Sequence, residues 1–344
     1  MLTGHTGFKG GWLALWLQHI GSEVSGFSLP APTSPSLFEA ARIADNMHSI
    51  MGDIREAGRV TGVMQAAEPE IVFHLAAQPL VRHSYREPVE TYMTNVMGTV
   101  HVLEAVRKTQ SVKVVINITS DKCYENREWP WGYRENEPMG GFDPYSSSKG
   151  CAELVSSAYR NSFFSDTDGQ GVRLASVRAG NVIGGGDWAE DRLIPDILRA
   201  FVRQKAVVIR NPTSIRPWQH VLEPLAGYML LAERLFEDAS LAQGWNFGPR
   251  DEDAKPVNWI VEQMARMWGD AKWELEGKPQ PHEAQYLKLD CSMARTRLGW
   301  EPRWDLLTAL EKVTSWHKAW LAGQDMRAFC LQQIDGYMTA VQHD

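Results

Sequence analysis

The chain has 344 residues, of which 44% are hydrophobic and 22% charged, and its formal net charge is -7. This acidic balance argues against a nucleic-acid-binding protein, which normally carries a basic surface, and no apolar run approaches the ~20 residues that span a bilayer. The four cysteines lie far apart, without the spacing of metal ligands, so we expect reduced thiols, no metal site and a cytoplasmic location.

The first predicted element is a glycine-rich turn that leads into an amphipathic helix with apolar residues at helical spacing, Leu13, Trp16, Leu17 and Ile20. Gly4, Gly7 and Gly10 in this turn would let backbone approach a pyrophosphate at the helix N-terminus, where free N–H groups favour anions. The spacing is G-x-x-G-x-x-G instead of G-x-G-x-x-G, so a purely structural glycine turn is the alternative.

Two features of this segment depart from the usual dinucleotide-binding pattern. Only three residues precede Gly4, whereas a full strand of ~5–6 residues is normal. We therefore expect a truncated or misassigned start, and an apolar extension should raise stability and cofactor content. Pro30 stands about where an acid would bind the ribose 2′-hydroxyl, and no arginine lies near enough for a 2′-phosphate, so NAD is preferred over NADP.

Strand-like runs then alternate with helical patterns, at residues 71–75, 112–118 and 172–177. Such alternation predicts an α/β fold of the Rossmann type, a doubly wound parallel sheet whose first strand is short. Beyond Gly184 the pattern becomes irregular, which indicates a smaller C-terminal α+β lobe. We expect an NAD-binding domain over 1–183, to which 220–248 returns, and a mainly substrate-binding lobe over 184–344.

The residues that carry chemistry are Tyr145 and Lys149, one helical turn apart, and the preceding stretch Ser120, Asp121 and Lys122. A nearby ammonium favours a phenolate, so we expect the pKa of Tyr145 to fall and the phenol to act as a base. The upstream hydroxyl, carboxyl and amine would add the groups needed for an elimination. Taken alone, a Tyr-x-x-x-Lys pair also arises by chance as an ordinary exposed helix pair.

With these residues in hand, the chain resembles the extended short-chain dehydrogenase/reductase family and, within it, the nucleotide-sugar 4,6-dehydratases. The family-wide motifs are TGHTGFKG at 3–10, GDIR at 52–55, HLAAQ at 74–78, TNVMGT at 94–99 and YSSSK at 145–149. The narrower motifs are INITSDKCY at 116–124, RAGNVIGGGDW at 178–188, RLIPD at 192–196, IRPWQHVLEP at 215–224 and NFGPRDEDAK at 246–255. They resemble the branch that acts on a cytidine-diphosphate sugar.

The resemblance implies NAD as the cofactor. The residues that would hold it are Gly4, Thr6, Gly7, Phe8, Lys9, Gly10, Asp53, Ile54, Leu75, Ala76, Ala77, Gln78, Asn95, Tyr145, Lys149, Ala179 and Asn181. Among them Asp53 would accept the adenine amine, and the small residues after position 75 would let the cofactor lie against the backbone.

The resemblance also implies the catalytic roles. Tyr145, assisted by Lys149 and Ser120, would take the proton of the sugar 4-hydroxyl. Asp121 would donate a proton to the departing C6 hydroxyl, so its pKa must be raised, as burial would do. Lys122 stands where related dehydratases carry a glutamate that removes the C5 proton. It is either a neutral amine that acts as the base, an ammonium that stabilises the C5 enolate, or a side chain that points away.

The anionic substrate needs cations and N–H donors. The candidates for substrate binding are Asn181, Arg192, Leu193, Arg210, Arg216, His220 and Tyr286. The resemblance further implies a homodimer or a dimer of dimers, held by a four-helix bundle of the helix beginning at Thr94 and the helix that carries Tyr145.

Three other functions stay open at the sequence level. A sugar-nucleotide 4-epimerase would share Tyr145 and Lys149 but would need no elimination acid such as Asp121. A dehydratase for another sugar nucleotide is closer. A non-catalytic NAD-binding protein is favoured only by the short first strand.

Overall fold

The computed structural model describes all residues except 165–170, 210, 270–271, 276–286 and 341–344. Its largest element is a seven-stranded parallel sheet with the strand order β10-β6-β5-β4-β1-β2-β3. The strands are β1 (Leu2–Thr3), β2 (Ser25–Ser28), β3 (His48–Met51), β4 (Ile71–His74), β5 (Val114–Ile118), β6 (Arg173–Ala179) and β10 (Gly244–Phe247).

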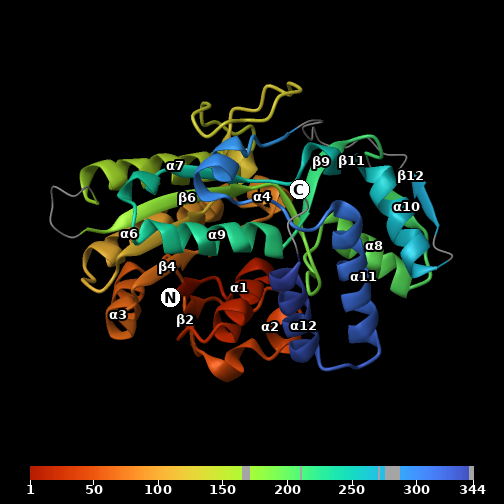
Figure 1. Cartoon of the computed structure of the whole chain (residues 1–344), viewed down its shortest axis with the longest axis horizontal. Helices are drawn as coiled ribbons and strands as arrows, with labels where there is room; N and C mark the ends of the chain where they lie inside the picture. The colour runs from red at the N-terminus through yellow and green to blue at the C-terminus, as the bar shows by residue number, and fades with distance from the viewer. Residues whose placement is uncertain (165–170, 210, 270–271, 276–286, 341–344) are drawn as a thin grey trace.

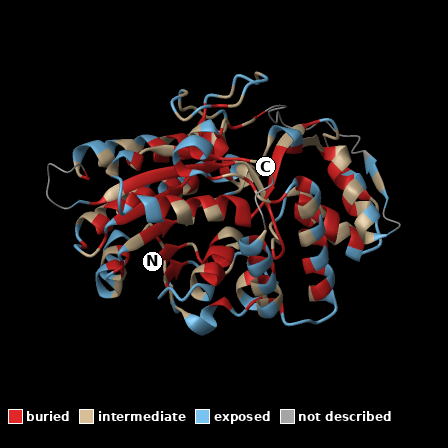
Figure 2. Cartoon of the chain, in the orientation of Figure 1, coloured by how far each residue is buried: buried red, intermediate tan, exposed pale blue. Residues whose placement is uncertain are grey.

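Helices cover both faces of this sheet (Figure 1). One face carries α3 (Ala57–Ala67), α6 (Gly98–Arg107) and α7 (Pro144–Ser162), and the other carries α1 (Phe8–His19) and α9 (Leu222–Leu235). The strand residues alternate between the two cores, since Val72 packs with α3 and α6 while Phe73 packs with α1 and α9. Because helices cover both faces, the central strands are largely buried, as Figure 2 shows, and most of their residues are apolar.

The second half of the chain builds a smaller lobe beside the sheet (Figure 1). A three-stranded sheet joins β7 (Asn181–Ile183), β9 (Ile215–His220) and β11 (Ala254–Pro256), and a two-stranded sheet joins β8 (Val207–Ile209) and β12 (Trp273–Leu275). The helices α8 (Leu193–Val202), α10 (Val257–Trp268) and α11 (Leu306–Leu321) form one apolar cluster with these strands. None of the described helices combines the length and the apolar character needed to cross a membrane.

Short helices connect these parts. They are α2 (Leu37–Ala40), α4 (Val81–Arg86) and α5 (Pro88–Tyr92), and a π-helical turn at Met93–Met97 joins α5 to α6. The helix that the sequence places at Thr94 therefore begins earlier, at Pro88, where proline is favourable in the first turn.

The expected fold class is confirmed, and two later segments of the chain join the first unit. The segment 220–248 supplies α9 and β10 to the seven-stranded sheet. The last helix, α12 (Met326–Thr339), packs against α1, with the Trp16 and Tyr337 rings 5.5 Å apart. The C-terminal end of the chain therefore also returns to the first unit, which the expected boundary of a 184–344 lobe does not describe.

A buried carboxyl group joins α9 to the C-terminal segments. Glu223 accepts hydrogen bonds from the backbone N–H groups of Arg303 (3.0 Å) and Trp304 (2.8 Å) and from the Tyr337 phenol (2.7 Å). Burial raises the pKa of Glu223 to about 7 in spite of these donors. The same group that connects three segments is therefore a source of pH-dependent stability.

We predict that the free energy of unfolding of Glu223→Gln changes less between pH 5 and pH 8 than that of wild type. The folded-state pKa lies above the unfolded value of 4.5, so the folded state binds more protons. Glu223 therefore contributes about 3 kcal/mol to the free energy of unfolding below pH ~4.5, and this contribution is lost as the pH rises through 7. The variant loses one side-chain oxygen that accepts these hydrogen bonds at all pH values, which costs about 1–3 kcal/mol.

The measurement is urea unfolding of wild type and variant at several pH values between 5 and 8. The gap between them should be largest at pH 5 and should shrink as the pH rises. Glu233→Gln, an exposed position on the same helix, is the matched control and should run parallel to wild type. A constant gap for Glu223→Gln would contradict the prediction.

Candidate active site

The parallel strands bring four loops to one edge of the main sheet. β1, β4, β5 and β6 all end there, and the chain continues into the glycine turn, residues 75–78, residues 119–123 and residues 180–181, respectively. β1 lies between β2 and β4, where the order of strands reverses. In open α/β sheets, ligands bind at the carboxyl ends of the strands beside this reversal.

The backbone of the glycine turn lies so close to other backbone atoms that Gly4 and Gly10 leave no room for a side chain. Gly4 has a φ of +79°, and a Cβ atom there would lie 2.7 Å from the Ala76 backbone nitrogen. A Cβ atom at Gly10 would lie 2.1 Å from the Gly4 carbonyl oxygen. Both positions therefore need glycine, which keeps the start of α1 close to the end of β4.

The start of α1 suits an anion. Gly7 is its N-cap residue, no described side chain caps this end, and the first turn contains no acid. The first-turn N–H groups and the helix dipole therefore favour a negatively charged ligand. Thr6 fixes the turn by donating to the Leu29 carbonyl oxygen (2.8 Å) and by contacting the Ser28 hydroxyl (2.7 Å).

Asn95 connects the loop after β4 to α7. Its Oδ1 accepts from the Gln78 N–H (2.8 Å), and its Nδ2 donates to the Gln78 carbonyl oxygen (3.0 Å) and to the Ser148 hydroxyl (2.8 Å). This buried amide thus sets the backbone of the predicted cofactor loop. Leu75 and Ala76 are fixed in a similar way, since their N–H groups donate to the Thr3 hydroxyl (3.1 and 3.2 Å).

Asp53, which we expected to contact the adenine, forms hydrogen bonds with another residue of the chain. Asp53 accepts from the backbone N–H and the Nε of Arg55, both at 2.8 Å, and this hydrogen bonding lowers the pKa of Asp53. Ile54 packs against Gly98, where a Cβ atom would lie 2.5 Å from the Ile54 side chain. Asp53 can still accept from a ligand, because an ionised carboxylate has further lone pairs.

The catalytic candidates converge where β5 ends beside the start of α7. Asp143 caps α7 by accepting from the Ser146 N–H (3.0 Å), which places Tyr145 in the first turn. The Lys149 amine donates to the Ile118 carbonyl oxygen (3.3 Å). Ser120 donates to Asp121 (3.0 Å) and also interacts with the Tyr145 phenol. The structure thus brings together four of the five residues that we expected to be catalytic.

Burial changes the protonation of the Tyr145–Lys149 pair in a way the sequence did not predict. Desolvation raises the pKa of Tyr145 to about 12, and hydrogen bonding from Ser120 is the largest effect that opposes this shift. Desolvation also lowers the pKa of Lys149 to about 8. The expected fall in the phenol pKa is therefore wrong for the described residues, because the cost of burying an anion exceeds the attraction of nearby cations.

Asp121 behaves as expected of an elimination acid. Its side chain is buried, and desolvation raises its pKa against the opposing effects of Lys122, Ser120 and Arg216. Gly180 leaves space beside it, since a Cβ atom there would lie 3.3 Å from Asp121 Oδ2. The half-buried Lys122, the next residue in the chain, has the largest opposing effect.

The glycine turn contributes a further amine. The Lys9 amine lies 5.8 Å from the centre of the Tyr228 ring. Desolvation lowers the pKa of Lys9 to about 7, with further lowering by Lys149 and Arg192. Phe8 lies beside it at the first position of α1, near Gly184.

The smaller lobe supplies cations that reach the catalytic groups. Arg192, the N-cap residue of α8, donates to Asp187 (3.0 Å), and its charge also acts on Tyr145. Arg216 on β9 donates to the Ile215 carbonyl oxygen (3.2 Å), and its charge acts on Asp121. Leu193 begins α8, Ala179 ends β6 and Asn181 begins β7 at the same edge. Arg210 and Tyr286 lie outside the described residues.

The expectation that His220 binds substrate is not supported by its position. The side chain is fully buried, between the rings of Trp12 (6.1 Å) and Trp304 (5.0 Å). Its Nδ1 accepts from the Leu222 N–H (3.3 Å), and burial lowers the pKa of His220 to about 3. A neutral imidazole in this core supports the start of α9.

The sequence analysis did not identify two buried charged residues that lie next to the catalytic candidates. Glu153 of α7 and Arg178 of β6 form an ion pair (2.8 Å), and Glu153 also accepts from the Thr119 hydroxyl (2.5 Å). The available signal was a glutamate one helical turn after Lys149 and an arginine inside an apolar strand. A charged residue in a buried strand requires a partner.

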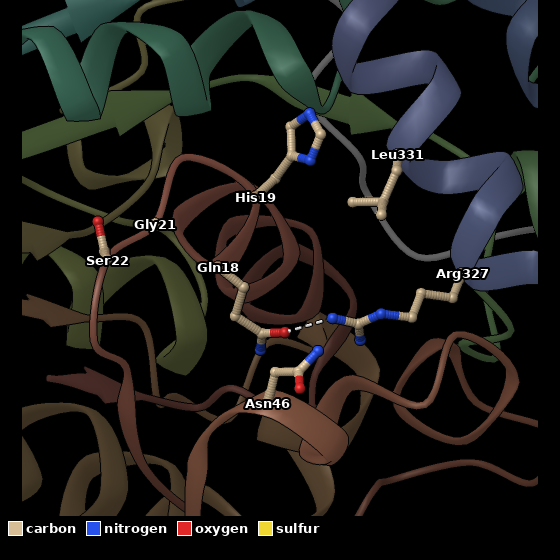
Figure 3. A pocket seen from close by; sticks show the side chains of 7 residues that line it. All are labelled: Gln18, His19, Gly21, Ser22, Asn46, Arg327 and Leu331. Carbon is tan, nitrogen blue, oxygen red and sulfur yellow. Dashed lines mark hydrogen bonds between the residues drawn. The ribbon is translucent and has the colours of Figure 1, made fainter.

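A surface pocket elsewhere does not belong to this site. It lies between the end of α1 and α12 and is lined by Gln18, His19, Gly21, Ser22, Asn46, Arg327 and Leu331 (Figure 3). Arg327 crosses it and donates to Gln18 (2.8 Å). None of the predicted catalytic, cofactor-binding or substrate-binding residues lines this pocket.

Comparison with known sequences identifies similar proteins over almost the whole chain. The family model for GDP-mannose 4,6 dehydratase matches residues 1–313. A CDP-glucose 4,6-dehydratase from Salmonella typhimurium strain LT2 is 62% identical over 343 residues, covering 98% of this chain and 96% of its own length. A dTDP-glucose 4,6-dehydratase from Streptomyces antibioticus is 28% identical over 285 residues, covering 78% of this chain and 76% of its own length.

Solved structures share the fold at lower identity. MoeE5 in complex with UDP-glucose and NAD superposes with a TM-score of 0.79 at 24% identity, covering 93% of this chain and 98% of its own. A dTDP-glucose 4,6-dehydratase from Bacillus anthracis in complex with NAD gives a TM-score of 0.75 at 20% identity, covering 92% and 95%. These likenesses establish the architecture.

Proposed function

The chain belongs to the GDP-mannose 4,6 dehydratase family, and on this basis we propose that it is a hydro-lyase that converts CDP-glucose to CDP-4-keto-6-deoxyglucose and water. The observation that carries the reaction type is Asp121, a buried acid with a raised pKa beside Ser120 and Tyr145. The 62% identity to a CDP-glucose 4,6-dehydratase supports the substrate. The product would supply deoxysugar synthesis.

The residues around the glycine turn fit NAD. The close approach of Gly4 to Ala76 and the uncapped start of α1 leave room and N–H donors for a pyrophosphate. Gly4, Gly7 and Gly10 would hold it, with Asp53 at the adenine end. When bound, NAD supplies the hydride acceptor for C4 and the hydride donor for C6.

The chain's own groups move the protons. Tyr145 takes the proton of the 4-hydroxyl as a phenolate, and because burial raises the pKa of the phenol, this form requires cationic support, for which Arg192 and Lys149 are the candidates. The resulting 4-keto group acidifies the C5 proton. Asp121, whose pKa is raised by burial, gives its proton to the C6 hydroxyl as water leaves.

Lys122 is the candidate for the C5 step. Two roles remain compatible with its place beside Asp121. A neutral amine would remove the C5 proton, and an ammonium would stabilise the enolate that forms at C5. An epimerase would need neither Asp121 nor Lys122, which is why this pair favours a dehydratase.

The substrate proposal predicts a clear ranking among nucleotide sugars. Purified protein is incubated separately with CDP-glucose, dTDP-glucose, UDP-glucose and GDP-mannose, and 4-keto-6-deoxy product is measured by NMR. We expect product from CDP-glucose with a kcat/KM about 5- to 150-fold above the other three, since one unsatisfied base contact costs about 1–3 kcal/mol. Faster turnover of another sugar nucleotide would overturn the substrate, and a 4-epimer would overturn the reaction type.

The assignment of Asp121 and Lys122 predicts different defects for two neighbouring variants. Asp121→Asn loses the proton for water release, so product formation should fall about 10²–10⁴-fold, while C5–H exchange with D2O continues. Lys122→Met should abolish both exchange and product formation. The measurement is deuterium at C5 by NMR, together with product yield. Retained exchange in Lys122→Met would remove Lys122 from the C5 step, and normal turnover of Asp121→Asn would remove Asp121 as the acid.

We also propose a homodimer that forms a four-helix bundle from α7 and the α5–α6 helix. Large apolar side chains are exposed on these neighbouring helices, including Val89 (75% exposed), Met93, Met97 and Leu154 (60% exposed). A twofold copy would bury this surface, and cyclic dimers are the commonest closed assembly.

Leu154→Glu should therefore dissociate the dimer, because it places a charge in an apolar interface. Leu321→Glu, at an exposed apolar position on α11, is the matched control and should remain dimeric. Sedimentation velocity measures the mass of each protein. A wild-type monomer, or a dimer that persists in Leu154→Glu, would contradict the proposed interface.

A further inference from the structure

Glu153 is a buried carboxylate next to the catalytic candidates. It lies on α7 one turn after Lys149, and its carboxylate is buried. It accepts four hydrogen bonds, from the Thr119 hydroxyl (2.5 Å), the Ser176 hydroxyl (2.6 Å), and the Nε (2.9 Å) and Nη2 (2.8 Å) of Arg178. Thr119 is the residue that follows β5 and precedes Ser120. The Glu153 carboxylate is therefore hydrogen-bonded to the loop that carries Ser120 and Asp121.

Arg178 holds this carboxylate from the opposite side. Its Nη1 donates to the Tyr124 phenol oxygen (2.5 Å) and to the Glu135 carbonyl oxygen (3.0 Å). Gly244 leaves space for the guanidinium, since a Cβ atom there would lie 2.4 Å from Nη2. The planar guanidinium is therefore fixed by neighbours from three segments, and it fixes Glu153 in turn.

The titratable groups that act on Lys149 or lie beside it come from four elements. They are Lys9 of α1, His74 of β4, Cys123 of the turn after β5, and Tyr145 and Glu153 of α7. Burial lowers the pKa of His74 to about 3 and raises that of Cys123, so both are neutral. Hydrogen bonds and Arg178 hold the pKa of Glu153 low. Glu153 is thus the negative charge within this described set.

We propose that Glu153 is a positioning residue for the dehydration: its carboxylate keeps Lys149 as an ammonium ion and fixes Thr119, so that Ser120 and Asp121 meet Tyr145. This inference rests on the proposed function. The charge matters because burial already lowers the pKa of Lys149 to about 8, and Glu153 is the largest effect that opposes this shift. Without it, Lys149 would lose its proton at a lower pH, and the phenol of Tyr145 would lose cationic support.

A purely structural role explains the pair less well. Buried ion pairs contribute little net stability compared with apolar residues of similar volume. A purely structural role also predicts that a folded variant keeps the wild-type pH dependence of kcat/KM. The proposed role predicts that this pH dependence shifts.

The test compares pH profiles of kcat/KM for CDP-glucose. Glu153→Gln leaves the Arg178 charge buried and unpaired, so Glu153→Gln/Arg178→Met is tested beside it. Both proteins should show the basic limb of the profile, set by deprotonation of Lys149, moved to lower pH by about one unit. Turnover at pH 8 should fall about 5-fold or more, with little change in KM, because Glu153 is buried behind the catalytic residues.

Ser176→Ala is the matched control, because it removes one hydrogen bond to Glu153 and keeps the charge. It should have a lower melting temperature and an unchanged basic limb. If a folded double variant keeps the wild-type profile, the proposal is overturned. If wild type forms no 4-keto product from CDP-glucose, the proposed function fails instead, which distinguishes the two.

Where neither charge-free variant folds, Glu153→Asp decides. It keeps the charge and withdraws the carboxylate by one methylene, so the basic limb should stay in place while kcat falls at least ~10-fold through lost positioning. An unchanged kcat, or a shifted limb, overturns the proposal.

Discussion

Desolvation at the carboxyl edge of the sheet is the constraint on which the site depends. It raises the pKa of the acids Tyr145 and Asp121 and lowers that of the amines Lys9 and Lys149. All four groups are therefore driven toward their neutral forms, as burial always disfavours charge. For Asp121 this is the state that an elimination acid needs. For Lys149 it is the opposite of what a supporting cation needs, so that residue requires a compensating anion.

The fold meets these conflicting needs with one connected set of buried contacts. The end of β5 carries Ser120 and Asp121, and α7 carries Tyr145 and Lys149. Asn95 joins α7 to the loop after β4, and Glu153 joins it to Thr119. The geometry of the site is thus set by residues that are not themselves reactive, and each lies on a helix or directly at a strand end, which limits its movement.

The sequence was sufficient for the fold class, because buried parallel strands are apolar and their intervening helices are periodic. It was also sufficient to place Tyr145 and Lys149 together, because they are neighbours on one helix turn. It was not sufficient for Glu223, whose donors lie about 80 and 114 residues away in the chain. The burial of His220 could not be predicted, because a motif identifies a position along the chain but not the Trp304 ring that packs against it. The pKa of Tyr145 was misjudged because the sequence shows the neighbouring cation but not the depth of burial.

The two lobes are coupled through charge as well as through contact. Arg192 of the smaller lobe lowers the pKa of Tyr145, and Arg216 lowers that of Asp121. An anionic group that paired with these arginines would weaken both effects, so the pKa values of both acids would rise. For Asp121 this means that a bound pyrophosphate would favour the protonated acid, which is the form that releases water. The same pairing would lower the fraction of Tyr145 that is present as the phenolate, and this increases its dependence on a protonated Lys149.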